Sequence, residues 1–169
     1  MALEVELPVE ADYEEFLQLN ESCVPHVNSI GMDDMVFFHK TAHSFIKIVE
    51  DGRLAGYVIA LTPGVDYKSL NYQWFSREIP DFLYIDRIMV HPDFRRRGVA
   101  TYIYQYLERV ALEDTIDCLC CEVNLVPENP ESLALHGRLG FIQEATQQTE
   151  NGAKEVSLLV KSLMTGKSV

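Results

Sequence analysis

The chain has 169 residues, the size of a single domain. Hydrophobic residues make up 47% of it and charged residues 24%, which is typical of a soluble globular protein and excludes a disordered one. With 14 basic and 26 acidic residues the net charge is −12, which disfavours a nucleic-acid partner, and no apolar run is long enough to cross a membrane. Because residues 1–6 lack the basic and apolar parts of a signal peptide, we expect a cytoplasmic protein with no membrane partner.

Apolar periodicity predicts helices and strands that alternate along the chain. Helices are expected over residues 11–22, 33–41, 98–114 and 130–139, and strands over 44–50, 53–61, 82–90, 118–123, 141–148 and 153–161. Asp51-Gly52 and Asn151-Gly152 are typical hairpin turns. This order predicts an α/β or α+β domain with a mixed sheet, flanking helices and a C-terminal hairpin.

A segment rich in aromatic residues separates the strands at 53–61 and 82–90. It holds Tyr67, Tyr72, Trp74 and Phe75, and we expect it to be a loop. Such a loop would be a lid over a ligand, a flap that completes the core, or a subunit contact.

Three of the four cysteines lie close together, at Cys118, Cys120 and Cys121, with Cys23 far away in the sequence. No second cluster supplies ligands at the spacing of zinc sites, so we expect no metal. The cysteines are interpreted as small core residues.

The segment from residue 82 onward joins the clearest predicted strand to the clearest predicted helix. The loop between them carries Arg95, Arg96 and Arg97, followed by Gly98. The first amides of a helix are unpaired and partly positive, and glycine lets a ligand approach the backbone. These features favour a pyrophosphate site, although three arginines paired with surface acids in a solvated turn would leave the same pattern. Neither a Walker-type phosphate loop nor a dinucleotide fingerprint is present.

Two short motifs resemble those of the GNAT superfamily of N-acyltransferases. The acyl-CoA-binding signature of that family is Arg/Gln-x-x-Gly-x-Gly/Ala, and Arg95, Gly98 and Ala100 fill it. Residues 129–141 are similar to the family's downstream motif, which runs Asn-x-x-Ala/Ser, then an aromatic residue, then Gly-Phe. The order of the predicted elements also fits the family over nearly the whole chain.

The resemblance implies a single GNAT-like domain over residues 1–169 with a mixed, mostly antiparallel sheet. The strands that end at Val90 and Val123 would splay apart and form a cleft for acetyl-CoA or another acyl-CoA. The main chain of the first strand would bind the pantetheine arm, and the loop amides would bind the diphosphate. The implied cofactor contacts are Ile88, Met89, Val90, Arg95, Arg96, Arg97, Gly98, Val99, Ala100, Thr101, Asn124 and Asn129.

Three residues are the catalytic candidates. His136 stands where many relatives have a tyrosine that protonates the CoA thiolate, so it is either that acid or a polar contact on its helix. Asp86 is a carboxylate within an apolar strand, where burial would raise its pKa. It is either the general base or a structural group paired with neighbours such as Arg87. Tyr84 shares its face of the strand and would hold a water or the acceptor.

The resulting hypothesis is an N-acetyltransferase that moves an acyl group from acyl-CoA to a primary amine of a small molecule or peptide, by direct attack in a ternary complex. Two alternatives are a non-catalytic acyl-CoA-binding sensor or assembly subunit, and a plain mixed-sheet domain with no CoA site. A homodimer is possible through the aromatic segment or the C-terminal hairpin. The residues expected to bind the acceptor are Asn20, Asn28, Tyr72, Trp74 and Phe75.

Overall fold

The computed structural model describes residues 2–164, and the chain divides into two compact units. The first unit runs to Leu61 and resumes from Ile85 to Leu107, and the second comprises Thr62–Tyr84 and the chain from Glu108 onward. Seven strands are hydrogen-bonded in the order β1-β2-β3-β4-β5-β7-β6, and most neighbouring pairs are antiparallel. This confirms the predicted fold class, a mixed α/β fold with a mostly antiparallel sheet.

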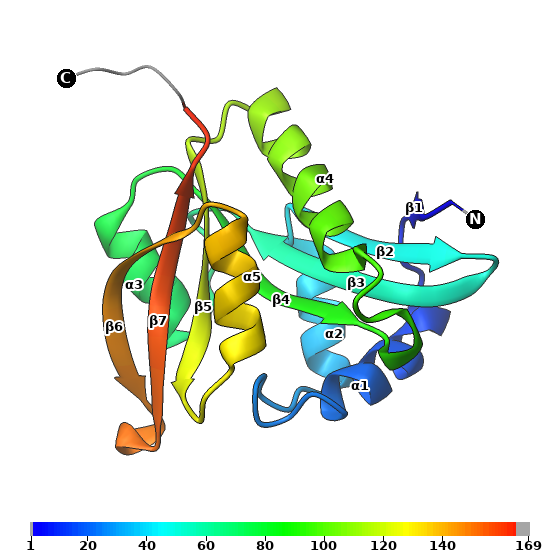
Figure 1. The fold of residues 1–169 in the computed structure, drawn as a ribbon, viewed down its shortest axis with the longest axis horizontal. Helices are drawn as coiled ribbons and strands as arrows, with labels where there is room; N and C mark the ends of the chain where they lie inside the picture. The colour runs from blue at the N-terminus through cyan, green and yellow to red at the C-terminus, as the bar shows by residue number, and fades with distance from the viewer. Residues whose placement is uncertain (1, 165–169) are drawn as a thin grey trace. The chain divides into compact units, whose positions relative to one another are not determined.

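The first unit contains the N-terminal helices and strands. β2 and β3 form the hairpin predicted from Asp51-Gly52, and β1 adds to it in antiparallel fashion (Figure 1). The elements are β1 (Glu4–Glu6), α1 (Tyr13–Glu21), α2 (Met32–Thr41), β2 (Ser44–Glu50) and β3 (Arg53–Leu61), with most of β4 (Leu83–Val90) and the first half of α4 (Val99–Glu113).

The core of the first unit explains why α1 forms where it does. Its apolar residues recur at helical spacing and face the strands, so that the ring of Phe16 stacks on Tyr57 and contacts Phe45. All three side chains are buried, and the Tyr57 hydroxyl donates to the carbonyl oxygen of Phe16. Burial raises the pKa of Tyr57, so this hydroxyl keeps its proton and its bond to α1.

The second unit contains the C-terminal strands. β5 runs parallel to the start of β4, with Leu83 opposite Leu119 and Tyr84 opposite Cys120, and β7 lies between β5 and β6 (Figure 1). The splaying of β4 and β5 beyond this ladder stays a prediction. The elements are α3 (Leu70–Glu78), β5 (Cys118–Val126), α5 (Pro130–Arg138), β6 (Ile142–Thr149) and β7 (Lys154–Ser162).

Ten helices and strands predicted from the sequence are present within a few residues of their expected ends. The aromatic segment is different: the prediction of a loop was wrong, because Leu70–Glu78 forms α3 with Ser69 as its N-cap. The short strand β1 was not predicted. Among residues 2–164 no helix has both the length and the apolar character needed to span a membrane.

Candidate functional site

The turn that leads into α4 leaves open space beside its backbone. Gly98 has a φ of +82°, and apart from its two chain neighbours no described residue has a heavy atom within 4 Å of the position that a Cβ would take. The fifteen-residue helix α4 begins at the next residue, so its first amides, including those of Val99, Ala100 and Thr101, have no partner within the helix. This turn therefore has the shape and polarity to receive an anion.

Arg97 holds the loop between β4 and α4 in place. Its guanidinium forms an ion pair with Glu50, with Nη2 and Oε2 2.6 Å apart, and lies 5.0 Å from the ring centroid of Phe94. Arg53 also lies over this ring, at 5.1 Å, and pairs with Asp93 at 2.6 Å. The buried Phe94 ring is thus contacted by two cations, which ties the loop to the β2–β3 hairpin.

The other two arginines of the loop differ from Arg97. Arg95 donates from Nε to the carbonyl oxygen of Val90 at 3.4 Å, and its Nη2 lies 3.8 Å from the Cys23 sulfur. Arg96 is exposed, has a left-handed φ of 59° and forms no hydrogen bond or ion pair with residues 2–164. Neither Arg95 nor Arg96 forms an ion pair among residues 2–164, and the Arg96 guanidinium is the one that has no hydrogen bond there either.

The second half of β4 alternates between buried and half-buried residues. Arg87 and Met89 are buried, whereas Ile88 and Val90 are half-buried. The carbonyl oxygen of Met89 faces β3, because a Cβ on Gly56 would lie 2.4 Å from it. Residues 88 and 90 thus have the more accessible positions among the three predicted to bind the pantetheine arm. Gly56 was missed by the sequence analysis, although a glycine inside an apolar strand signals a close approach of backbones.

Asp86 and Arg87 form a buried ion pair at the middle of β4. Arg87 Nε donates to Asp86 Oδ2 at 2.7 Å, and the two side chains are 2% and 3% exposed. Arg87 also donates to the side-chain oxygens of Asn20 at 2.8 Å and of Asn28 at 3.2 Å. The structure thus brings together Asp86, Asn20 and Asn28, and a residue outside the predicted set, Arg87, joins them.

His136 lies on α5 in the second unit and is buried. Its Nδ1 lies 2.7 Å from the carbonyl oxygen of Ser132, which only accepts, so Nδ1 carries a hydrogen. Burial lowers the pKa of His136, and the bond to Ser132 opposes this in part. The neutral imidazole is thus favoured, and Nε2 carries a lone pair.

Other predicted residues of the second unit have structural contacts. The Tyr84 hydroxyl donates to Glu122 Oε1 at 3.0 Å. Asn129 is the N-cap of α5, and its side-chain oxygen accepts from the amide of Ser132. Asn124 is buried within β5. Their predicted contacts with substrates stay predictions.

The aromatic residues of α3 lie mainly in the core of the second unit. Tyr72 and Phe75 are 2% and 0% exposed, and their ring centroids lie 5.4 Å and 5.8 Å from that of Tyr84. Tyr72 also donates to the carbonyl oxygen of Thr62 and accepts from the amide of Val65. Of the three aromatic residues predicted to bind the acceptor, Trp74 alone is half-buried.

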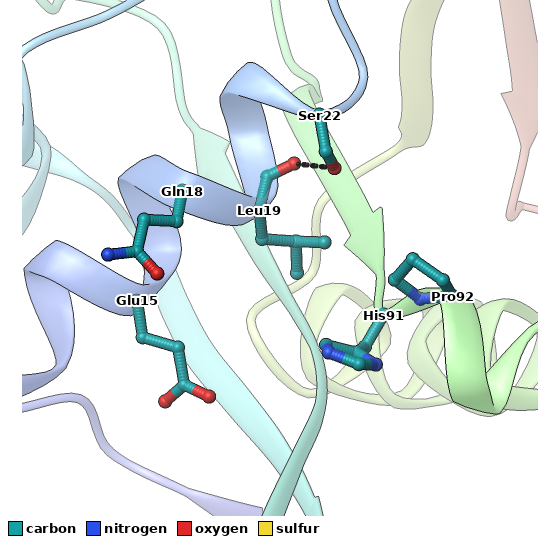
Figure 2. A pocket seen from close by; sticks show the side chains of 6 residues that line it. All are labelled: Glu15, Gln18, Leu19, Ser22, His91 and Pro92. Atoms are coloured by element: carbon teal, nitrogen blue, oxygen red, sulfur yellow. Dashed lines mark hydrogen bonds between the residues drawn. The ribbon is translucent and has the colours of Figure 1, made fainter.

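A small hollow lies in the first unit, beside the start of the loop that joins β4 to α4. It has a volume of about 240 Å³, and Figure 2 shows the side chains that line it from α1 and from the end of β4. They are Glu15, Gln18, Leu19, Ser22, His91 and Pro92. Its walls are mostly polar and exposed, so it is an open depression in the surface.

The cysteines of β5 are buried, as expected for core residues. Burial raises the pKa of the Cys118 thiol to about 11 and raises that of Cys120 well above its ordinary value. These thiols are protonated at neutral pH and are poor nucleophiles. Within residues 2–164 no group of three or more His, Cys, Asp or Glu side chains is arranged to hold a metal ion.

The model of the Acetyltransferase (GNAT) family matches residues 13–141. The chain belongs to this family. The match includes both sequence motifs and the Gly98 turn, so the resemblance is confirmed and the protein is an acyltransferase of the GNAT type.

Known members of the GNAT family resemble this chain at low sequence identity. The S-(2-succino)cysteine N-acetyltransferase of Bacillus subtilis (strain 168) is 22% identical over 158 residues, which cover 86% of this chain and 88% of that protein. The crystal structure of Ard1 from Thermoplasma volcanium superimposes with a TM-score of 0.80 at 14% identity, covering 98% of this chain and all of the other. The structure of yncA from Salmonella typhimurium, with its cofactor acetyl-CoA, has a TM-score of 0.72 at 15% identity and covers 100% of this chain and 98% of the other.

Proposed function

We propose that this GNAT protein transfers an acetyl or other acyl group from acyl-CoA to a primary amine of a small molecule or peptide, by direct attack in a ternary complex. The observation that carries the proposal is the open Gly98 turn at the start of α4, with the cation of Arg96 beside it, which has no partner among residues 2–164. A diphosphate needs several donors and positive charge, and this turn supplies both.

Two segments of the first unit would hold the acyl-CoA. The amides at the start of α4 and the Arg96 guanidinium bind the diphosphate, and Arg97 keeps the loop in shape through Glu50. The half-buried residues Ile88 and Val90 bind the pantetheine arm through their main chain. Acyl-CoA supplies an activated thioester carbonyl, and a main-chain amide of β4 polarises it.

The lowered pKa of His136 bears on one of the two proton transfers that the reaction requires. Amide formation makes a C–N bond and breaks the C–S bond, and one proton moves from the amine nitrogen to the departing sulfur. Asp86 receives the amine proton through water. Because the lowered pKa of His136 disfavours the imidazolium, water rather than His136 protonates the sulfur.

The curated relative suggests which acceptor amines to test first. The curated relative is an N-acetyltransferase of S-(2-succino)cysteine, and its 22% identity extends over most of both chains. We therefore place S-(2-succino)cysteine first in a panel of amines, followed by spermidine and a short peptide with a free N-terminus. The homodimer and the cytoplasmic location stay predictions.

The test is thiol release from acetyl-CoA in the presence of each amine, together with the Kd of CoA by calorimetry. We expect CoA binding and amine-dependent release with at least one member of the panel. Tight binding without release with any amine would instead favour the sensor, and absence of binding at millimolar CoA would overturn the proposal.

A glycine variant tests the location of the CoA site, and a second glycine variant is its control. Gly98→Val places a side chain in the open space of the turn and should weaken CoA binding by about tenfold or more. Gly64 has a similar φ of +92°, also has no neighbour within 4 Å and lies outside the loop, so Gly64→Val should carry a comparable backbone strain. CoA affinity that is lowered equally in both variants would contradict the assignment of the turn.

A further inference from the structure

The loop between α1 and α2 is fastened to β4 through Arg87. Asn28, in this loop, accepts from Arg87 twice, through its side-chain oxygen at 3.2 Å and its carbonyl oxygen at 3.5 Å. Asn20, at the end of α1, links the two, since its side chain accepts from Arg87 and donates to the Asn28 carbonyl oxygen at 3.0 Å. The guanidinium is buried and lies 5.5 Å from the Phe38 ring centroid, so it has few other positions to adopt.

The same loop also contacts the other end of the segment proposed to bind acyl-CoA. Cys23, at the start of the loop, lies 3.8 Å from Arg95, and Arg95 in turn donates to the carbonyl oxygen of Val90. The loop is therefore tied to Arg87 on one side of residues 88–90 and to Arg95 on the other, and all of these residues belong to the first unit.

We infer that Arg87 is a positioning residue, which through Asn28 fixes the α1–α2 loop as a wall beside the thioester end of the acyl-CoA site. This inference rests on the proposed function for the orientation of acyl-CoA. With the diphosphate at residues 96–101, the arm extends back along β4, and its thiol end lies toward Arg87. The incoming amine must approach there, so a fixed wall lowers the entropy lost when the amine binds.

Two readouts test this wall, and one of them needs no amine. Cys23 is the half-buried thiol of the loop, whereas Cys118, Cys120 and Cys121 are buried, so 5,5′-dithiobis(2-nitrobenzoate) should react first with Cys23. The Cys23→Ser variant identifies that phase by removing it. The second readout is the KM of the most active amine in the panel, measured at saturating acetyl-CoA.

The main variant is Asn28→Ala, which removes one acceptor of Arg87 at an exposed residue and so should leave the fold intact. We expect Cys23 to react several-fold faster and the amine KM to rise by about tenfold, with kcat and the Kd of CoA changed less than about twofold. Asn28→Asp keeps the acceptor oxygen and should restore both readouts. Ser29→Ala is the matched control, because this neighbour bonds to Glu21 on α1 and not to β4, and it should leave both near wild type.

Arg87→Lys should act in the same direction as Asn28→Ala, because lysine keeps the charge but cannot reach all these acceptors at once. Cys23 reactivity and amine KM that stay at wild-type values in Asn28→Ala would overturn the inference, as would a lowered melting temperature with unchanged KM. A wild-type protein without amine-dependent thiol release would instead overturn the proposed function, and the Cys23 rates would then still decide whether Arg87 fixes the loop.

Discussion

The loop after β4 is rich in arginine and the helix α3 is rich in aromatic residues. In each of them, one residue contacts the rest of the fold while its sequence neighbour does so less. In the basic loop Arg97 pairs with Glu50, whereas its equally exposed neighbour Arg96 has no ion pair or hydrogen bond among residues 2–164. In α3 Phe75 lies in the core, whereas its neighbour Trp74 is half-buried. A run of similar residues is therefore not a run of similar roles, because backbone direction decides which side chains reach the scaffold.

The largest expected difference between neighbours is in α3. Phe75→Ala removes a fully buried ring that packs against Phe82 and Tyr84, and should lower the free energy of unfolding by about 3–5 kcal/mol. Trp74→Ala, the matched control, should cost clearly less. Urea denaturation followed by circular dichroism measures both, and a larger loss for Trp74→Ala would contradict the division of α3 into core and exposed faces.

The second prediction concerns the close approach of β3 to β4, the strand that leads into the basic loop. Gly56→Ala would place a Cβ 2.4 Å from the Met89 carbonyl oxygen, so the backbone of β3 or β4 must move. We expect a loss of about 1–3 kcal/mol in unfolding free energy and weaker CoA binding. Gly137→Ala is the matched control, because that helical glycine has nothing within 4 Å and alanine favours helix. A Gly56→Ala protein as stable as wild type would show that Met89 is not fixed by β3.

The third prediction separates two adjacent arginines. Arg96→Ala should weaken CoA binding by about five- to tenfold and leave stability unchanged, because this side chain has no partner among residues 2–164. Arg97→Ala breaks the partly exposed ion pair with Glu50 and the contact with Phe94, so it should lower stability by about 0.5–1 kcal/mol. Calorimetry with CoA and thermal unfolding of each variant provide the measurements. Equal losses of affinity with unchanged stability in both would remove the distinction between the two arginines.

Local sequence patterns predicted the elements well, because each carries its own signal. The alternation in β4 and the helical spacing in α4 do not depend on distant partners. The α3 segment was mistaken for a loop because its pattern is weak: only Tyr72 and Phe75 of this nine-residue helix are buried, and most of the other residues are polar. Their burial follows from contacts with Tyr84, which no local pattern reveals.

The candidate site was predictable in part, for a similar reason. Gly98 and the start of α4 are local features, and the motif that contains them identified the family. The ion pair of Asp86 with Arg87 joins adjacent residues. The sequence analysis allowed for such a pair as the alternative to a general base at Asp86. The bonds from Arg87 to Asn20 and Asn28 span 67 and 59 residues, and only the folded chain brings them together.

The smallest expected effect is a pH-dependent change in unfolding free energy that depends on the buried side chain of His136. Its pKa is lowered in the folded protein, so between that value and the ordinary value near 6.5 the unfolded chain binds more protons. The stabilisation associated with neutral His136 is therefore complete above about pH 6.5 and is lost as the pH falls. Glutamine does not titrate in this range and can still donate to the Ser132 carbonyl oxygen. We expect the unfolding free energy of wild type to fall by about 0.5–1 kcal/mol more than that of His136→Gln between pH 7.5 and 5.5. Urea titrations at both pH values measure this difference, and equal losses in the two proteins would mean that protonation of His136 is not coupled to folding.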